Sequence, residues 1–363
     1  MIGTPNLSEL YCSYEDEYID AFKRFLHAGD FIGGNSIEHF EDALAKFLNK
    51  KYVVSCKSGT HALQLALKAS NIGQGDEVIS VANTYYATIW AIWSVGARVV
   101  FCDVGKDGLI DINKIEKCIT AKTKAILPVH LYGIPCEMNG ILRLCKKYDL
   151  FLIEDASHAF GGSFLKRNDK VLNPEKRFIC FSLYPTKNLG VMGDGGIIVT
   201  NSEFKATILK DLRYFSSNPL YGQFQKHAMH AQLDTLQAIL ATENLKYINQ
   251  WSRHRQSLAK QYAEAFCNHI DYLPDIVGKE VVPYVFPIFH EDRDRLLNYL
   301  KEHGVFAQIH YKTDLHKLGW FNGKRNISLP QTEWHNAHVL TLPLFPTLSN
   351  ENAEFICKTI LNF

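Results

Sequence analysis

The sequence has no long hydrophobic run and no excess of charge of one sign. No apolar stretch approaches the about 20 residues that cross a bilayer, and the N-terminus, MIGTPNLSELYCSYEDEY, lacks a basic segment followed by an apolar one. With 39 basic and 38 acidic residues the net charge is +1, which gives no electrostatic reason to expect a nucleic acid or an anionic membrane as partner. We therefore expect a cytoplasmic protein that binds neither.

Paired cysteines are also missing. The nine cysteines include no CxxC pair and several stand within apolar stretches, so we interpret them as reduced core residues rather than zinc ligands or disulfide partners. We expect no metal site. What the chain does have is length, because 363 residues with 47% hydrophobic content can bury one large core with a smaller domain attached.

From residue 52 onward, short apolar runs alternate with helical patterns. Such alternation predicts an α/β fold with a mostly parallel sheet covered by helices on both faces, in which ligands collect at the carboxyl ends of the strands. The strand-like runs are 52–56, 77–81, 98–102, 125–129 and 151–154, and the helical patterns are 60–69, 84–95, 112–119 and 138–147.

Helical patterns flank this region on both sides. Two amphipathic helices are expected before it, and a mixture of helices and short strands after residue 200, which predicts a small α+β C-terminal domain. We place the large domain, with the N-terminal helices, at 1–245 and the small domain at 246–363. The flanking helices are expected at 14–28, 36–48, 202–214, 233–265, 293–304 and 350–361, and the strands at 281–289, 306–309 and 339–342.

The stretch 178–200 carries the most informative chemistry. It reads FICFSLYPTKNLGVMGDGGIIVT and places Lys187 in the turn between two apolar runs of strand character. Partial burial of that lysine would lower its pKa and free the amine as a nucleophile able to form a Schiff base. Taken alone, a lysine beside a glycine-rich loop is more often solvated, so the interpretation needs support from other segments.

The run FSLYPTKNLGVMGDGG resembles the lysine motif of the DegT/DnrJ/StrS family of pyridoxal 5'-phosphate (PLP) dependent nucleotide-sugar aminotransferases. The similarity extends from about residue 31 to about residue 348. It implies the aspartate aminotransferase-like fold, PLP-dependent transferase fold type I, with PLP as the cofactor carried by Lys187. Relatives that are sugar dehydratases replace this lysine by histidine, so Lys187 argues against that route.

A phosphate anchor is expected in CKSGTHA, residues 56–62. A strand end, a glycine and a helix start provide backbone N–H groups and a helix dipole that favour a phosphate. The commoner use of Ser58 or Thr60 at such a place is to cap the helix. The resemblance implies that Gly59 and Thr60 bind the PLP phosphate and that Ser182 adds a further contact.

The segment EDASHAFG, residues 154–161, follows the apolar run FLI. An acid at the end of a core strand is costly to bury unless it is paired, and a pyridinium nitrogen would be such a partner. The resemblance assigns that role to Asp155, places His158 near the phenolic oxygen of the cofactor and stacks Tyr85 on the pyridine ring. A lone histidine and an aromatic residue at a helix start are otherwise usually structural.

One segment departs from the family pattern. Relatives usually carry Gly-x-Asn-x-Arg before Leu-Asp-x-Leu-Gln, and the asparagine reaches the PLP phosphate of the neighbouring subunit, whereas this chain has AMHAQ at residues 228–232. His230 would replace the asparagine and Gln232 the arginine. Because histidine can still donate a hydrogen bond, His230 is a candidate cofactor ligand across a homodimer with shared active sites.

Candidates for substrate binding come from other segments. The loop GDFIGG, residues 29–34, resembles a loop near the subunit interface of relatives, although a simple turn between helices would also explain it. The segment IHY, residues 309–311, resembles the family's His-Tyr-Pro, with Lys312 in place of proline. Lys226 is one more candidate to contact a nucleotide diphosphate, but solvated surface is the commoner fate of such residues. The substrate candidates are Phe31, Gly33, Tyr184, Arg213, Tyr221, His310 and Tyr311.

Together these matches predict an aminotransferase that moves an amino group from L-glutamate to a nucleotide-linked keto sugar. Lys187 would hold PLP, be displaced by the donor amine and carry a proton between the substrate carbon and the cofactor. The run NTYYATIWAI, residues 83–92, resembles members that aminate dTDP-linked 3-keto-6-deoxyhexoses for surface polysaccharides such as the O-antigen of lipopolysaccharide. Amination at C4, a UDP-linked sugar or an inositol-type ketone stays open, as does a non-catalytic regulatory protein that binds PLP.

Overall fold

The computed structural model describes residue 2 and residues 5–167, 171–215, 227–322 and 327–363. Its centre is a seven-stranded sheet with the order β1-β7-β6-β5-β4-β2-β3. Strand β7 runs antiparallel to both neighbours, whereas the other pairs are parallel. The strands are β1 Tyr52–Cys56, β2 Glu77–Ser80, β3 Arg98–Phe101, β4 Thr123–Ile126, β5 Phe151–Asp155, β6 Arg177–Ser182 and β7 Gly196–Thr200.

The sheet separates two hydrophobic cores, and β6 shows why its run of apolar residues forms a strand. Successive side chains of a strand point to opposite faces. Phe178 and Cys180 therefore enter one core, while Ile179 and Phe181 enter the other. A strand buried on both faces needs apolar residues at nearly every position, as expected for a mostly parallel sheet covered by helices.

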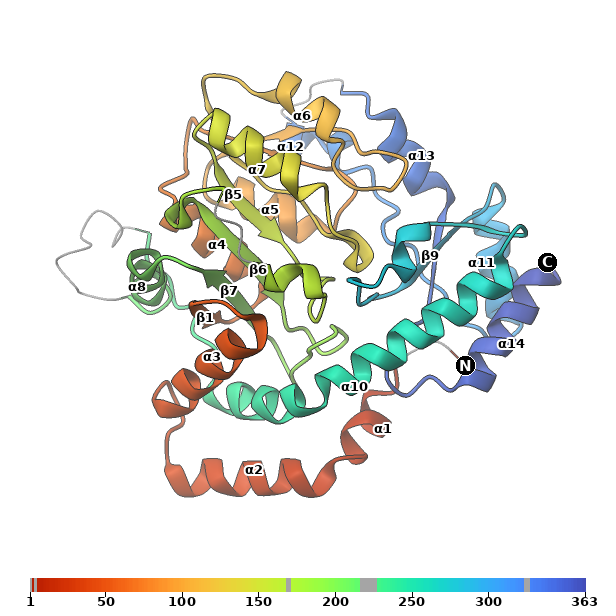
Figure 1. The fold of residues 1–363 in the computed structure, drawn as a ribbon, viewed down its shortest axis with the longest axis horizontal. Helices are drawn as coiled ribbons and strands as arrows, with labels where there is room; N and C mark the ends of the chain where they lie inside the picture. The colour runs from red at the N-terminus through yellow and green to blue at the C-terminus, as the bar shows by residue number, and fades with distance from the viewer. Residues whose placement is uncertain (1, 3–4, 168–170, 216–226, 323–326) are drawn as a thin grey trace.

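Helices cover the sheet and extend beyond it (Figure 1). The N-terminal and sheet-covering helices are α1 Leu7–Cys12, α2 Glu15–Ala28, α3 Asn35–Leu48, α4 Gly59–Ala69, α5 Tyr86–Ser94, α6 Ile112–Cys118, α7 Met138–Lys147 and α8 Glu203–Leu212. The later helices are α10 Thr235–Phe266, α11 Arg293–Glu302, α12 Gly319–Asn322, α13 Pro330–His338 and α14 Asn350–Leu361. Short three-ten turns occur at Leu131–Gly133, Ser163–Lys166, Pro174–Lys176, Pro274–Val277 and Leu315–Lys317.

Helix α10 connects the two ends of the molecule. It is 32 residues long and runs along the lower side of Figure 1, from beside α3 to beside α14. The C-terminal part adds a three-stranded sheet with the order β10-β9-β8, built from β8 Asp271–Tyr272, β9 Phe286–Phe289 and β10 Val339–Leu342. The expected boundary at 245/246 falls within α10, and the division into two domains stays a prediction.

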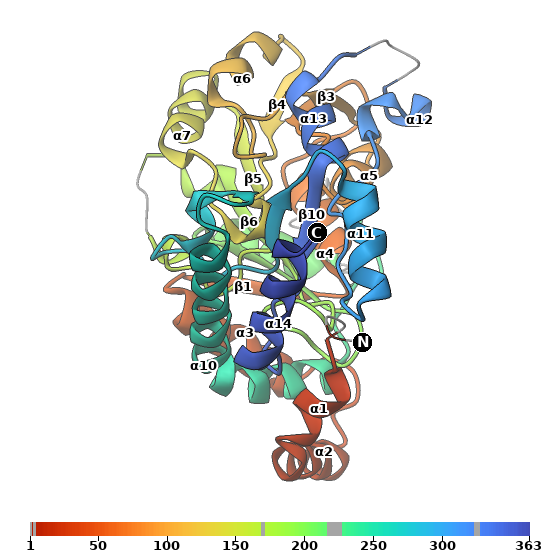
Figure 2. The ribbon, with the colours of Figure 1, turned by 90° about the vertical axis from the view of Figure 1, so that its right-hand side faces the viewer.

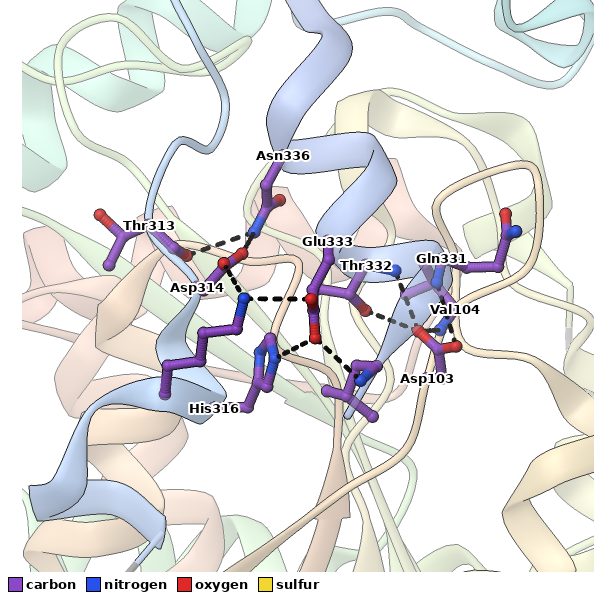
Figure 3. A network of polar contacts seen from close by, with 11 residues as sticks. Asp103, Val104, Thr313, Asp314, His316, Gln331, Thr332, Glu333 and Asn336 are labelled. Carbon is purple, nitrogen blue, oxygen red and sulfur yellow. Dashed lines mark hydrogen bonds and ion pairs between the residues drawn. The ribbon is translucent and has the colours of Figure 1, made fainter. Parts of the chain in front are cut away.

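Two contacts join distant parts of the chain. Ile2 donates its N–H to the carbonyl of Gly304 at 2.8 Å, and its own carbonyl accepts the N–H of Phe306 at 2.6 Å. The carboxylate of Asp103, just after β3, accepts hydrogen bonds from the first turn of α13 (Figure 3). In the view of Figure 2, α1 and α2 form the lower end of the molecule while α11 and α14 face the viewer.

The expected α/β class is confirmed, and the expected bounds of β1, α7 and α14 coincide with the observed ones. The strand expected at 306–309 is wrong, because Gln308 forms an isolated bridge to Thr341 instead. The strand expected at 281–289 is shorter, starting at Phe286. Helix α13 was not expected, since the capping carboxylate of Asp103 comes from a segment more than 200 residues away.

Within the described ranges, none of the helices combines the length and the apolar character that a membrane span requires. In the same ranges no group of three or more His, Cys, Asp or Glu side chains is arranged to hold a metal ion.

Candidate active site

A cleft of about 730 Å³ opens at the carboxyl ends of the parallel strands. Its size lies within the range of small-molecule sites, roughly 300–1,000 Å³. One wall comes from segments next to the large sheet, namely the starts of α4 and α5, the end of β5 and the turn after β6. The opposite wall comes from the C-terminal part, with Tyr284, Gln308 and residues 341–345. The cleft is thus assembled from segments far apart in the sequence.

Lys187 lies in this cleft, in the turn between β6 and β7, as the sequence predicts. Its Nζ stands 4.4 Å from the centroid of the Tyr284 ring, a cation–π distance. Burial lowers the pKa of Lys187, while Tyr284 and the carboxylate of Asp155 oppose that shift. At a given pH, a larger fraction of Lys187 than of a solvated lysine therefore has a neutral amine. The neutral amine is the nucleophilic form of the side chain.

Two adjacent acids end β5. Because side chains alternate between the two faces of a strand, their carboxylates lie in different surroundings. The buried Glu154 accepts a hydrogen bond from Nε of the partly buried Arg177 at 2.7 Å and lies 3.1 Å from Nε2 of the buried His130. Asp155 is 5% exposed and lines the cleft. Its Oδ2 accepts the hydroxyl of Thr88 at 2.8 Å and its Oδ1 accepts the N–H of Ser157 at 3.1 Å. Asp155 is therefore the acid available to a ligand.

The start of α4 forms another part of the cleft. Ser58 caps the helix by accepting the N–H of His61 at 3.2 Å, so the capping interpretation holds for Ser58. Gly59 and Thr60 follow as the first helical residues and line the cleft together with Ser182. A Cβ on Gly59 would stand 2.7 Å from the Cβ of Ser182, so glycine permits the close packing of this helix start against the end of β6.

His158 is buried, and its ring nitrogens both have protein partners. Nδ1 accepts the N–H of Tyr132 at 3.3 Å, so the neutral ring carries its proton on Nε2, which lies 3.1 Å from the hydroxyl of Tyr311. Burial, with Lys187 and His310 nearby, lowers the pKa of His158 well below its usual range. The contact of His158 with a cofactor oxygen, implied by the resemblance, stays a prediction.

His310 and Tyr311 come from the C-terminal part and line the same cleft. Thr341 donates its hydroxyl to the carbonyl of Gln308 at 2.9 Å, so it accepts the proton of Nδ1 of His310 at 2.7 Å. Burial and the nearby Lys187 lower the pKa of His310 to about 4. The ring is neutral at physiological pH, with the proton on Nδ1 and a lone pair on Nε2.

Aromatic side chains form the outer wall. Tyr85 precedes α5, is 46% exposed, and has its ring centroid 5.9 Å from that of Tyr311. Tyr184 is also exposed and lines the cleft. The structure therefore brings ten of the expected residues together in one cleft: Gly59, Thr60, Tyr85, Asp155, His158, Ser182, Tyr184, Lys187, His310 and Tyr311.

Arg213 is not placed at the cleft, which corrects its expected contact with substrate. Its guanidinium forms a buried ion pair with Glu41 and donates to the carbonyl of Ser55 at 2.8 Å. These partners hold α3, β1 and the end of α8 together. The local sequence around Arg213 contains no sign of Glu41, which lies 172 residues earlier.

Three other candidates lie outside this cleft. Phe31 is 55% exposed, Gly33 has φ of +75°, and His230 is exposed with its ring 5.7 Å from that of Tyr214. Tyr221 and Lys226 lie outside the described residues. Roles of these side chains in a neighbouring subunit's site stay predictions.

Two cleft residues were missed by the sequence reasoning. Tyr284 packs against His158, with the ring centroids 4.3 Å apart, and lies next to Nζ of Lys187, but its surroundings in the sequence contain no motif. Thr88 donates a hydrogen bond to Asp155, and the sequence did contain a pattern that pointed to Thr88. Thr84 and Thr88 stand four residues apart at a helix start, a spacing that places both hydroxyls on one side.

The residues present fit PLP. An amine on a turn, a buried carboxylate and a helix start with a close-packed glycine share one cleft, and these are the groups needed to bind an aldehyde, a pyridine nitrogen and a phosphate. When bound, PLP supplies the electron sink that amino-acid side chains lack. The fold and the site together define a PLP-dependent enzyme of fold type I.

Comparisons with known proteins agree. The model of the DegT/DnrJ/EryC1/StrS aminotransferase family matches residues 13–361. The chain belongs to this family and is a PLP-dependent aminotransferase. The similar proteins include a dTDP-3-amino-3,6-dideoxy-alpha-D-galactopyranose transaminase of Aneurinibacillus thermoaerophilus, 35% identical over 99% of both chains.

A second relative is a pleiotropic regulatory protein of Geobacillus stearothermophilus, which is 32% identical over 99% of this chain and 97% of the relative. A third is a UDP-2-acetamido-2-deoxy-3-oxo-D-glucuronate aminotransferase of Pseudomonas aeruginosa, which is 30% identical over 100% of both chains. Among solved structures, S. venezuelae DesV in complex with a ketimine intermediate has a TM-score of 0.90 and 31% identity, covering 100% of this chain and 98% of that one. Bacillus subtilis ntda with bound PMP has a TM-score of 0.86 and 28% identity, covering 99% of this chain and 82% of that one.

Proposed function

We propose that the enzyme transfers an amino group from L-glutamate to a nucleotide-linked keto sugar, with a dTDP-linked 3-keto-6-deoxyhexose as the acceptor. The observation that carries the proposal is the composition of one cleft. Lys187 and Asp155 lie deep in it, while Tyr184, His310 and Tyr311 form a polar and aromatic wall that suits a sugar. Its volume of about 730 Å³ leaves room for a substrate beside the cofactor.

Each of the main cleft residues would have a separate role in this reaction. Lys187 binds the cofactor covalently through its amine, and once released it moves a proton at the substrate carbon. Its lowered pKa suits both tasks. Asp155 would hold the pyridine nitrogen in its protonated state. The backbone of Gly59 and Thr60, with the hydroxyl of Ser182, would bind the phosphate.

The choice of sugar rests on the relatives. The A. thermoaerophilus relative is named as a transaminase for a dTDP-linked 3-amino-3,6-dideoxy sugar and aligns over 99% of this chain, which supports a 3-keto acceptor linked to dTDP. A UDP-linked 3-keto sugar is the second candidate, because the P. aeruginosa relative is named for one. Amination at C4 of a dTDP- or UDP-linked 4-keto-6-deoxy sugar would use the same catalytic groups.

A homodimer with shared active sites is part of the proposal. The loop at 29–34 and the segment at 230–235 lie side by side, since Thr235 donates its hydroxyl to the carbonyl of Gly33 at 3.1 Å. Both carry exposed side chains outside this subunit's cleft, Phe31 and His230. We propose that together they complete the partner's cleft, with His230 donating to the cofactor phosphate.

We also propose that the enzyme works in the cytoplasm in the synthesis of a deoxyamino sugar for a surface polysaccharide. All nine cysteines of the chain are free thiols in the structure, as suits a reducing compartment. Cell fractionation would test the cytoplasmic location. Loss of an amino sugar from surface polysaccharide when the protein is removed would test the biosynthetic role.

The test of the activity is an assay with L-glutamate and a panel of dTDP- and UDP-linked 3-keto and 4-keto sugars, comparing wild type with Lys187→Ala. Turnover of a dTDP-linked 3-keto sugar that disappears in Lys187→Ala is expected, whereas Lys301→Ala, an exposed lysine on α11, should keep it. Preference for a UDP-linked or 4-keto sugar would replace the proposed acceptor. Turnover that survives in Lys187→Ala would overturn the lysine assignment.

A further inference from the structure

A chain of two buried hydroxyls leads to the carboxylate of Asp155. Thr88 donates its hydroxyl proton to Oδ2 of Asp155 at 2.8 Å. The same hydroxyl lies 2.8 Å from that of Thr84. A hydroxyl has a single proton, which Thr88 gives to Asp155, so Thr84 must be the donor to Thr88. The chain therefore has one direction, from Thr84 to Thr88 to Asp155.

The surroundings make this chain stronger than two isolated hydrogen bonds. Thr84 and Thr88 are 2% and 1% exposed, so water does not compete for their hydroxyls. Hydrogen bonds to an ionised group are about twice as strong as neutral ones, and in a buried chain each bond polarises the next. The chain thus holds Oδ2 of Asp155 on the side of α5.

The second oxygen of Asp155 is fixed from the other side. Oδ1 accepts the N–H of Ser157 at 3.1 Å, a contact within its own turn. With both oxygens held, the carboxylate has one orientation relative to the cleft, which Thr84, Thr88 and Asp155 all line. A ligand nitrogen that approaches Asp155 meets an acceptor already in place, so little ordering is needed on binding.

We propose that Thr88, supported by Thr84, is a positioning residue that orients the carboxylate of Asp155 toward the pyridine nitrogen of the cofactor. The inference rests on the role of Asp155 in the proposed function. Thr88 itself donates to Asp155, so it acts through that residue. Loss of its hydroxyl leaves Oδ2 of a buried carboxylate without this donor, so the carboxylate is no longer held in one orientation and binds the cofactor more weakly.

The experiment compares Thr88→Val, which keeps the shape and removes the hydroxyl, with Thr88→Ser, which keeps the hydroxyl. The dissociation constant of PLP is measured by absorbance titration without substrate, together with the pH dependence of the bound cofactor's visible spectrum. Thr88→Val should weaken PLP binding by about 10-fold and shift the spectral transition, and Thr84→Val should have a smaller effect, about 3-fold. Thr88→Ser should stay within about 2-fold of wild type.

Controls separate this inference from the role of Asp155. Thr359→Val removes a buried hydroxyl that bonds the carbonyl of Phe355, far from the cleft lining, and should leave both readouts unchanged. Asp155→Asn should weaken binding more than Thr88→Val does. If Asp155→Asn shows that defect while Thr88→Val, folded by circular dichroism, matches wild type in both readouts, the positioning role is overturned and the role of Asp155 stands. If Asp155→Asn also matches wild type, both are overturned.

Discussion

The carboxylate of Asp103 caps helix α13 at Thr332, although 229 residues separate the two in the chain. Oδ1 accepts both the N–H and the hydroxyl of Thr332 at 2.9 Å (Figure 3). Oδ2 accepts a hydrogen bond from Nζ of Lys114 at 3.0 Å. A helix of nine residues that begins with Pro330 thereby obtains its N-terminal acceptor from a segment distant in the sequence. The contact ties α13, and β10 that follows it, to the edge of the large sheet.

Replacing Asp103 should therefore destabilise the protein. Asp103→Asn is expected to lower the free energy of unfolding by about 2 kcal/mol, because a buried acceptor with several charge-assisted donors is lost. Burial raises the pKa of Asp103, but the donors of Thr332, Lys114 and Gln331 outweigh it and lower the pKa overall. Its contribution is thus present above pH 3.8, the ordinary value, and is lost as pH falls further. Urea unfolding measures this, with the exposed Asp271→Asn as control, and equal stability of the two variants would contradict it.

The reactivity of Lys187 should depend on pH and on Tyr284. Burial lowers the pKa of Lys187, so covalent attachment of PLP to the apo-enzyme should reach half its maximal rate below pH 10.5, the ordinary lysine value. Tyr284→Leu removes the ring 4.4 Å from Nζ, which favours the ammonium, and should move that midpoint to lower pH. Tyr284→Phe keeps the ring but loses the phenol group, so its midpoint should lie between those of wild type and Tyr284→Leu. Stopped-flow absorbance between pH 6 and about 10 measures the midpoint, and identical midpoints in the Leu and Phe variants would refute the role of the ring.

The pair of acids at the end of β5 predicts a separate effect on stability. Burial raises the pKa of Glu154, but the charge of Arg177 and the bond to His130 outweigh it and lower the pKa to about 2. A lowered carboxylate pKa stabilises the fold above pH 4.5, and that contribution is lost as pH falls toward 2. Glu154→Gln should cost about 3 kcal/mol at neutral pH, because it removes the buried charge that pairs with Arg177 and contacts His130. It should also make the free energy of unfolding depend less on pH in the acid range.

Thermal unfolding at several pH values checks the prediction for Glu154. Glu116→Gln is the matched control, since Glu116 pairs with Lys147 on the surface and should change little. A stability curve of Glu154→Gln parallel to that of wild type from pH 2 to about 7 would show that the pair does not carry the acid sensitivity.

Gly59 should not tolerate a side chain. In Gly59→Ala the new Cβ would meet the Cβ of Ser182 at 2.7 Å and its Cα at 3.0 Å, so the helix start must shift away from the end of β6. We expect PLP binding to weaken by about 10-fold, since such overpacking costs on the order of 1–3 kcal/mol. Gly73→Ala is the control, because its Cβ would find the carbonyl of Val95 at an ordinary 3.5 Å. Absorbance titration with PLP compares the two, and unchanged affinity in Gly59→Ala would remove this segment from the phosphate site.

The proposed contribution of His230 to the partner's cleft can be tested by mixing variants. Lys187→Ala and His230→Ala should each be impaired alone. After joint refolding, heterodimers contain one site with both residues intact, so activity should recover to roughly a quarter of the wild-type value. Size-exclusion chromatography with light scattering checks the dimer in the same samples. If mixing restores nothing although heterodimers form, His230 does not serve the other subunit.

Local sequence was enough to place several candidate residues in the fold. Lys187 was placed in a turn by the strands and the glycine-rich segment around it, and Asp155 at a strand end by the apolar run before it. Gly59 was placed between a strand end and a helix, while the roles proposed for all three came from the family resemblance. In each of these segments the residues that define the local backbone are neighbours in the chain, so the pattern predicts the place of the side chain.

Arg213 shows where such reasoning fails. Its neighbours do not reveal that Glu41 and Ser55 will surround it, and only the packing of α3 on β1 decides that it serves stability rather than substrate. The same holds for Tyr284, which reaches Lys187 from the C-terminal part, and for helix α13, whose cap comes from Asp103.

The sequence by itself predicted the α/β class and the order of most strands and helices along the chain, because apolar periodicity and turn residues act over a few neighbouring positions. The resemblance to a known family, which also rests on the sequence, pointed to Lys187 and Asp155. The tertiary structure decided which histidine nitrogen carries a proton and which basic side chains are held in ion pairs. These depend on partners up to 229 residues apart, which burial of the two cores brings together. Burial also strengthens their hydrogen bonds, because it removes the water that would compete for the same polar groups.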